Sequence, residues 1–375
     1  MKEIPIQDGD DISKGNRVLW WSRSGRDYSR DRIVRQAFRT LGWQIEDFTP
    51  RISSLGDLEA TLFLAGGRPD LVWVPCFRQR DARAAARWSK RRGIPVIFDP
   101  LISTYDKQVF ERQKFVADSH SARKLLRWES SLFLLFDKLI ADTDCHADFF
   151  HEVLGYPRER IDVIPVSAEE ELFAPREKSV SSDPLIVLFY GSFIHLHGID
   201  VIIEAASAVP EVQWNLLGDG PLRAKYAELA AHQKNVQLMP SVPYSQLQEQ
   251  IGTSDILLGV FSPSGKAGRV IPNKVYQSLA CGRPVITRKS PAYPSTIRSQ
   301  PGTASGMIFV DPGNADALAE AVRGMAQCKA ELTTWNKAAR KTYETYFAND
   351  RVRKPLKTLL DQVSSHDRQI DSDQL

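Results

Sequence analysis

The stretch Arg269–Arg288, R-V-I-P-N-K-V-Y-Q-S-L-A-C-G-R-P-V-I-T-R, decides the fold class, because it predicts a loop, a helix and a buried strand. Pro272 suits the first turn of a helix, where its missing N–H costs nothing. Gly282 provides the left-handed residue that a helix C-terminus favours. Pro284–Thr287 is a short apolar run, as expected of a central parallel strand. The stretch therefore predicts a helix whose N-terminus, near Asn273, emerges from an α/β sheet.

The N-terminus of this helix is also a candidate anion site. Its free N–H groups and its dipole favour an anion, typically by ~0.3–1 kcal/mol. Three basic residues, Lys266, Arg269 and Lys274, lie at the same end in the sequence. The alternative is an ordinary buried helix with solvated basic residues. This stretch alone does not distinguish the two interpretations.

The composition is that of a globular protein with room for two domains. The chain has 375 residues, of which 42% are hydrophobic and 25% charged, values typical of folded proteins. A net charge of +3 is too small to indicate nucleic-acid binding. The four cysteines lie far apart without a C-x-x-C pair, which fits reduced thiols in the cytosol better than zinc or disulfides. No stretch has the length and apolarity of a membrane span or signal peptide, so we expect a cytoplasmic protein.

Strands and helices alternate through the chain in two successive series. The first series predicts strands at 17–21, 44–48, 71–74, 95–98, 138–141 and 161–165, and helices at 31–41, 81–92 and 125–136. The second predicts strands at 185–190, 214–217, 236–239, 255–260 and 284–287, followed by helices at 315–325, 333–347 and 350–363. This alternation indicates two doubly wound α/β domains, with the strand-end loops of each on one edge. We expect the two edges to face each other across a central cleft.

Two regions of the first half are candidates for contact with an acceptor. Asp99 and Asp106 follow the predicted strand 95–98, at the edge where α/β sheets bind ligands; the alternative is that they cap local turns or helices. The helix 81–92 carries a set of basic residues that could meet anionic lipid or a phosphorylated acceptor, or could form a solvated face. These residues are Arg83, Arg87, Lys90, Arg91 and Arg92.

The second half resembles the family 4 (group 1) glycosyltransferases of GT-B fold, which use nucleotide-diphosphate sugars. The resemblance depends on several short motifs in a fixed order, each weak by itself. They are F-Y-G-S-F-I-H-L-H-G-I-D at 189–200, L-L-G-D-G-P-L-R at 216–223, V-P-Y at 242–244, S-D-I-L-L-G at 254–259 and I-P-N-K-V-Y-Q-S-L-A-C-G-R-P-V-I at 271–286. The first half matches the family only in architecture.

The resemblance implies an acceptor-side Rossmann-like domain at 1–175 and a donor-binding one at 184–340, with helices at 341–375 crossing back to the first. It implies that the diphosphate lies near a glycine loop, the base near a second loop, and the sugar under a third. The corresponding residues are Gly191, Ser192, His197 and Gly198 for the diphosphate; Gly218, Asp219, Gly220, Pro243 and Tyr244 for the base; Ser264 and Gly265 for the sugar; and Pro272, Asn273 and Gln277 for the phosphates or ribose.

The sequence departs from the family pattern at charged positions. Ser192 and His197 stand where the family usually has an arginine and a lysine, and Arg269 and Gln277 stand where it has two glutamates. A charge-assisted hydrogen bond contributes ~1.5–3 kcal/mol, so we expect nearby cations to compensate. Lys274, together with Lys266 or Arg269, is the predicted replacement, and Gln277 can still hydrogen-bond a ribose hydroxyl.

The predicted function is transfer of a sugar, with retention of its anomeric configuration, from a nucleotide-diphosphate sugar to a hydroxyl acceptor such as a glycan or lipid-linked glycan. Asp99 or Asp106 would position the acceptor. No D-x-D motif lies at a strand end of the second half, so we expect no metal and no cofactor. Two alternatives stay open: a GT-B epimerase or phosphorylase, and a nucleotide-sugar-binding protein that has lost catalysis.

Overall fold

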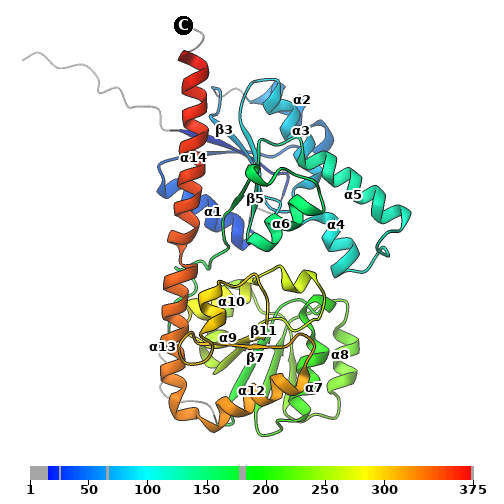
Figure 1. The fold of residues 1–375 in the computed structure, drawn as a ribbon, viewed down its shortest axis with the longest axis vertical. Helices are drawn as coiled ribbons and strands as arrows, with labels where there is room; N and C mark the ends of the chain where they lie inside the picture. The colour runs from blue at the N-terminus through cyan, green and yellow to red at the C-terminus, as the bar shows by residue number, and fades with distance from the viewer. Residues whose placement is uncertain (1–15, 25–26, 65–66, 177–182, 373–375) are drawn as a thin grey trace, which may run out of the picture.

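The computed structural model describes residues 16–24, 27–64, 67–176 and 183–372 and shows two α/β lobes stacked along the long axis (Figure 1). In the N-terminal lobe, six parallel strands pair in the order β2-β1-β3-β4-β5-β6. The strands β1 to β6 are Arg17–Trp21, Gln44–Phe48, Leu71–Val74, Val96–Phe98, Lys138–Ala141 and Ile161–Val163. The parallel α/β architecture predicted for this half is confirmed.

Helices pack on both faces of this sheet, so its central strands β3 and β4 are buried and apolar throughout. The helices are α1 (Ser29–Thr40), α2 (Gly56–Phe63), α3 (Gln79–Lys90), α4 (Thr104–Asp106), the π-helical turn η2 (Lys107–Glu111), α5 (His120–Phe133) and α6 (Asp144–Glu152). Helix α5 begins at His120, not at Leu125 as predicted, because the Ser119 side chain caps it by accepting from the Ala122 N–H at 3.2 Å. Helix α2 was not predicted.

The C-terminal lobe repeats the plan with the strand order β12-β11-β10-β7-β8-β9, again all parallel. The strands β7 to β12 are Ile186–Tyr190, Gln213–Leu217, Val236–Met239, Ile256–Leu258, Val285–Arg288 and Met307–Val310. The helices are α7 (Ile199–Ser207), α8 (Arg223–Ala230), α9 (Leu247–Thr253), α10 (Asn273–Ala280), α11 (Ser295–Ser299), α12 (Ala315–Gln327) and α13 (Leu332–Thr342). The edge strand β12 was not predicted.

Residues 269–288 form a loop, helix α10 and strand β11, as predicted. Pro272 stands immediately before the first helical residue, and Gly282 ends the helix with a φ of 66°. Arg283 N–H donates to the Ser278 carbonyl at 2.9 Å, which satisfies one of the carbonyls that a helix end leaves unpaired. Val275 and Leu279 are fully buried under the sheet. The helix is therefore fixed at both ends, and its N-terminus points toward the other lobe.

The C-terminal helices connect the two lobes along one side (Figure 1). Helix α13 packs on the C-terminal lobe, whereas α14 (Asn349–Ser372) buries Val352, Leu356 and Leu360 in the core of the N-terminal lobe. A further apolar cluster joins the lobes directly, since Leu101 packs in the same cluster as Ile271. The crossing of the C-terminal helix is confirmed, and the two sheet edges face each other. The numerical domain boundaries stay predictions.

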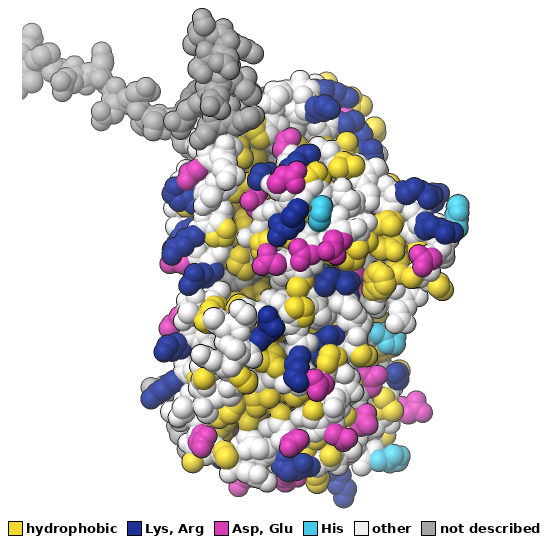
Figure 2. All heavy atoms as spheres, in the orientation of Figure 1, with side chains coloured by type: hydrophobic (Ala, Val, Ile, Leu, Met, Phe, Trp, Pro, Cys, Tyr) yellow, Lys and Arg dark blue, Asp and Glu magenta, His cyan; other side chains and the backbone are white. Residues whose placement is uncertain are grey.

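The basic helix α3 is only partly free to meet an external anion. Arg87 and Arg91 both pair with Asp57, and the Arg92 guanidinium lies 4.4 Å from the centroid of the Trp88 ring. On the face drawn in Figure 2, basic and acidic side chains are interspersed over both lobes. None of the helices in the described ranges is long and apolar enough to span a membrane.

Candidate active site

Three glycine-containing loops of the C-terminal lobe meet at the carboxyl edge of its sheet. A Cβ at Gly218 would stand 2.0 Å from the Gly191 carbonyl oxygen, and a Cβ at Gly198 would stand 2.5 Å from the Ser262 N. Gly191, Gly198 and Gly218 have φ values of 143°, 64° and 152°, a region that side chains rarely adopt. Glycine is therefore required here both for backbone conformation and for close packing. Glycine is also required at position 220, where φ is 154° and a Cβ would stand 2.7 Å from the Phe193 N.

Lys274 places a buried amine beside the first of these loops. Its side chain is 6% exposed, and its Nζ has no hydrogen-bond partner among the described residues. The Nζ lies 3.7 Å from the centroid of the Phe189 ring and 3.1 Å from where a Cβ of Gly191 would stand. Burial holds the pKa of Lys274 well below its usual value of 10.5. A buried amine is costly when it has no partner among the described residues, and its position at the start of α10, beside the Gly191 loop, makes it a candidate anion ligand.

His197, which replaces the basic residue of the family pattern, faces the same space. Its Nδ1 donates to the Ser192 carbonyl, and its ring packs against Phe189 at 5.4 Å between centroids. Burial, followed by the charge of Lys274, holds the pKa of His197 well below 6.5. His197 is therefore neutral at physiological pH, and it does not supply the missing positive charge. Ser192 contributes its carbonyl to this contact, and its side chain is exposed.

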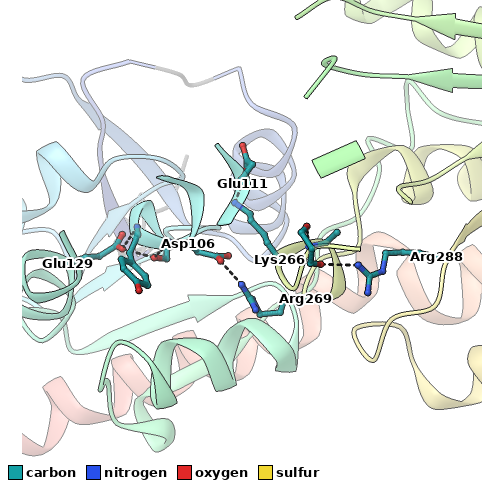
Figure 3. Close-up of polar contacts among 10 residues, drawn as sticks. Asp106, Glu111, Glu129, Lys266, Arg269 and Arg288 are labelled. Atoms are coloured by element: carbon teal, nitrogen blue, oxygen red, sulfur yellow. Dashed lines mark hydrogen bonds and ion pairs between the residues drawn. The ribbon is translucent and has the colours of Figure 1, made fainter. Parts of the chain in front are cut away.

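The two other predicted cations, Lys266 and Arg269, reach across the interface between the lobes. Lys266 donates to Glu111 and Arg269 donates to Asp106, both in the N-terminal lobe (Figure 3). The prediction that Lys266 or Arg269 shares the anion with Lys274 does not match this geometry, because their charges are already compensated by carboxylates. Asp106 likewise uses its carboxylate for Arg269, and it is fully buried.

Asp99, the other predicted acceptor ligand, is part of a buried ion pair. Its Oδ2 accepts from the Arg30 Nε at 2.8 Å, and both side chains are 1% exposed. Arg30 also donates to the Pro165 carbonyl at 3.0 Å. Burial raises the pKa of Asp99 above its ordinary range, although Arg30 opposes this effect. The geometry indicates a structural role under the sheet edge instead of contact with an acceptor.

Gln277 is not free to hold a ribose. Its Oε1 accepts from the Tyr190 hydroxyl at 2.8 Å, and its Nε2 donates to the Tyr244 hydroxyl at 2.7 Å. Tyr244 in turn donates to Glu169 at 2.8 Å, and Glu169 also accepts from Arg32. Gln277 is 2% exposed, so this geometry contradicts the expected ribose contact. Tyr190 and Glu169 were not predicted as site residues, because the sequence shows Tyr190 only as the end of a strand and Glu169 only as part of the acidic run 169–171 between the lobes.

A pocket of about 370 Å³ opens between the Gly191 and Gly218 loops. It is lined by Tyr190, Gly191, Ser192, Leu217, Gly218, Asp219, Ser241, Val242 and Leu247. Gly218 and Asp219 are among the residues for which the resemblance implies contact with the nucleoside base, and that contact stays a prediction. Pro243 follows the pocket wall directly in sequence but does not line it, and Tyr244 turns toward Glu169.

The remaining predicted residues form the loop and helix start beside Lys274. Ser264 gives its carbonyl to Arg288 at 2.9 Å, and Gly265 precedes the short turn η6 (Lys266–Gly268). Asn273 donates to the Tyr28 hydroxyl at 3.3 Å across the interface. The structure thus brings the predicted diphosphate loop, base loop and helix N-terminus together. Of the three nearby cations, Lys266 and Arg269 pair with carboxylates of the N-terminal lobe, and Lys274 contacts the Phe189 ring.

Comparisons with known proteins agree with this architecture. The family model described as "Glycosyl transferase 4-like domain" matches residues 16–167, and the one described as "Glycosyl transferases group 1" matches residues 184–327. The amylovoran biosynthesis glycosyltransferase AmsK of Erwinia amylovora is 24% identical over 219 residues, which are 56% of this chain and 53% of that protein. D-inositol 3-phosphate glycosyltransferase 1 of Catenulispora acidiphila is 23% identical over 312 residues, 76% of this chain and 70% of its own length. The aligned part of the chain spans about half the length of the first of these relatives.

Two solved structures share the fold over most of the chain. Anabaena Alr3699/HepE, crystallised in complex with UDP, superposes with a TM-score of 0.69 at 15% identity, covering 92% of this chain and 100% of that one. Sucrose-phosphate synthase from Thermosynechococcus elongatus superposes with a TM-score of 0.68 at 17% identity, covering 94% and 100%. The two-lobed GT-B fold predicted from the sequence is therefore confirmed.

Proposed function

This chain belongs to the family 4 (group 1) glycosyltransferases, and from that premise we propose that it transfers a sugar from a nucleotide-diphosphate sugar to a hydroxyl acceptor. The observation that carries the proposal is the buried Nζ of Lys274 beside the Gly191 loop, which has no hydrogen-bond partner in the part of the chain that the structure describes. In the reaction, the bond between the anomeric carbon and the diphosphate oxygen breaks as the acceptor oxygen bonds to that carbon. The acceptor proton leaves with the diphosphate, which carries the developing negative charge.

The role proposed for Lys274 is to stabilise this charge. An amine and peptide N–H groups that are already in place stabilise a leaving group better than solvent does, because they need no reorganisation. Lys274 is the second residue of α10, so its Nζ lies beside the Gly191 loop and its backbone lies in the first turn of the helix, where N–H groups have no partner within the helix. We further propose that this set makes transfer independent of a divalent metal, and that the anomeric configuration is retained.

The nucleotide that the protein binds is identified by measuring its melting temperature with UDP, GDP, ADP and TDP and with the corresponding nucleotide sugars. One nucleoside diphosphate at 100 times its Kd should stabilise the protein by about 2.7 kcal/mol, a rise of a few degrees in the melting temperature. UDP is the first to test, since a protein of the same fold was crystallised with it. Absence of any shift with all four would contradict the proposed function.

Product analysis then separates transfer from its alternatives. NMR of the product reports the anomeric configuration, and addition of EDTA reports metal dependence. Donor conversion without any acceptor would indicate an epimerase. Tight donor binding with no conversion in the presence of glycan and lipid-linked acceptors would indicate a binding protein that has lost catalysis.

Peripheral contact with an anionic membrane is a separate proposal for the basic face of α3. Of its basic residues, Lys90 borders a pocket of about 680 Å³ that also exposes Leu134 and Leu135, so charge and apolar surface lie together. Changing Lys90 and Arg83 to glutamate should reduce co-sedimentation with phosphatidylserine vesicles at least threefold at physiological salt. The same change at Lys289 and Lys357, exposed lysines outside this face, is the control, and equal binding of all variants would contradict the proposal.

A further inference from the structure

The N-terminal lobe presents two carboxylates from one rigid segment. Glu129, fully buried, accepts from the Ser103 hydroxyl at 2.6 Å, from the Thr104 N–H at 2.6 Å and from the Tyr105 N–H at 2.8 Å (Figure 3). These contacts hold the start of α4. The π-helical turn η2 then places Glu111 about one turn after Asp106. Both carboxylates consequently point toward the other lobe.

The loop that receives them belongs to the donor side. This loop comprises residues 262–269. Arg288 of the same lobe holds it by donating to the carbonyls of Ser262 at 2.6 Å and Ser264 at 2.9 Å. Its start is held to the diphosphate loop, because the Phe261 N–H donates to the His197 carbonyl at 3.0 Å. On the side of the N-terminal lobe, Lys266 pairs with Glu111 and Arg269 pairs with Asp106. The loop is therefore fixed from both lobes next to Lys274.

We propose that Asp106 and Glu111 are positioning residues for transfer, which orient the 262–269 loop at the donor site by pairing with Arg269 and Lys266 across the cleft. This inference rests on the proposed function. Lys266 and Asp106 are each 1% exposed, and Glu111 is 10% exposed. Desolvation of such pairs offsets much of their attraction, so their main effect is to fix geometry, and both pairs bridge the two lobes.

The competing explanation is that both cations leave these pairs to bind the donor diphosphate. The two explanations predict opposite results for the double variant Asp106→Asn/Glu111→Gln. If the carboxylates position the loop, kcat falls at least 30-fold, while the Kd for the nucleoside diphosphate changes less than threefold. If they only sequester the cations, their removal frees two positive charges, and the nucleoside diphosphate binds at least tenfold more tightly.

The experiment compares wild type, both single variants, the double variant and Asp106→Glu. Calorimetry gives Kd, initial rates give kcat and KM, and small-angle X-ray scattering without donor gives the radius of gyration. The matched control is Asp47→Asn, which removes the charge of a pair with Arg35 at 2.7 Å inside the N-terminal lobe. We expect a larger radius of gyration for the double variant alone, and recovery of at least a third of the wild-type kcat for Asp106→Glu.

Two results would overturn the inference: kcat of the double variant within threefold of wild type, or tenfold tighter nucleotide binding. If the double variant does not fold, as judged by circular dichroism, the kcat and the Kd of the two single variants are compared with wild type against the same thresholds. If wild type neither binds a nucleotide nor transfers a sugar, the proposed function fails. The scattering comparison needs no donor, so an unchanged radius of gyration would then overturn the inference separately.

Discussion

Changing Lys274 to methionine is expected to lower kcat/KM for the nucleotide sugar at least 100-fold. Methionine keeps the length and apolar volume of the side chain but removes the amine that lies beside the Gly191 loop. Removal of one preorganised donor from a developing oxyanion typically costs about 2.7–4 kcal/mol, which is a factor of 10² to 10³ in rate. Initial rates at several donor concentrations measure the change. A decrease smaller than about fivefold would remove Lys274 from the proposed role.

The same variant should be more stable than wild type at neutral pH. Burial lowers the pKa of Lys274 in the folded protein, whereas the unfolded chain keeps the ordinary value near 10.5. Between these two pKa values the unfolded state binds more protons, so the stability of wild type increases with pH. Lys274→Met has no such group. Its advantage in urea unfolding should therefore be largest at the lower pH values and should shrink as pH approaches 10.5.

Two further measurements separate this effect from general damage. Lys289→Met removes an exposed lysine of the same lobe, with a side chain 60% exposed, and should change neither rate nor stability appreciably. Binding of a diphosphate should raise the pKa of Lys274, so wild type should take up protons on binding. Calorimetry in two buffers of different ionisation enthalpy detects that uptake, and equal uptake by Lys274→Met would contradict the assignment.

Changing Asp99 to alanine is expected to destabilise the fold by about 3–5 kcal/mol, the typical cost of leaving one member of a buried ion pair alone. Arg30 would keep its charge at 1% exposure, with the Pro165 carbonyl still accepting from its guanidinium. Urea unfolding measures the loss. The alternative, in which Asp99 positions the acceptor, predicts an intact fold with a lower kcat.

A double variant tests the cause of that loss. Arg30→Met combined with Asp99→Leu removes both charges, so it should be more stable than Asp99→Ala alone. Asp361→Ala is the control for removal of an exposed carboxylate, because Asp361 pairs with Lys357 at about 60% exposure of both side chains. Its effect should stay below about 0.5 kcal/mol. A loss of less than 1 kcal/mol for Asp99→Ala would contradict the structural role.

Strand positions could be predicted because their signal is local. Strand β3 is a run of four buried apolar residues and β1 has four after Arg17, and β1, β3 and β9 have the predicted bounds. The missed strand β12 is the run M-I-F-V at a sheet edge, and D-P-G-N at 311–314 is a turn signal between it and the next helix, so the same local signal was present for this strand. The start of α5 was misplaced because its apolar periodicity begins after the capped first turn.

The sequence by itself determined the two-lobed α/β fold, the family and the loops that meet near Lys274, because periodicity, glycine spacing and motif order are properties of neighbouring residues. Only the tertiary structure decided which charges are free. Arg269, Lys266 and Lys274 look alike in sequence, yet two of them meet carboxylates more than 150 positions away, and the third meets an aromatic ring and a glycine turn. A side chain's charge is compensated by whatever the fold brings within about 4 Å of it, and sequence spacing does not encode that distance.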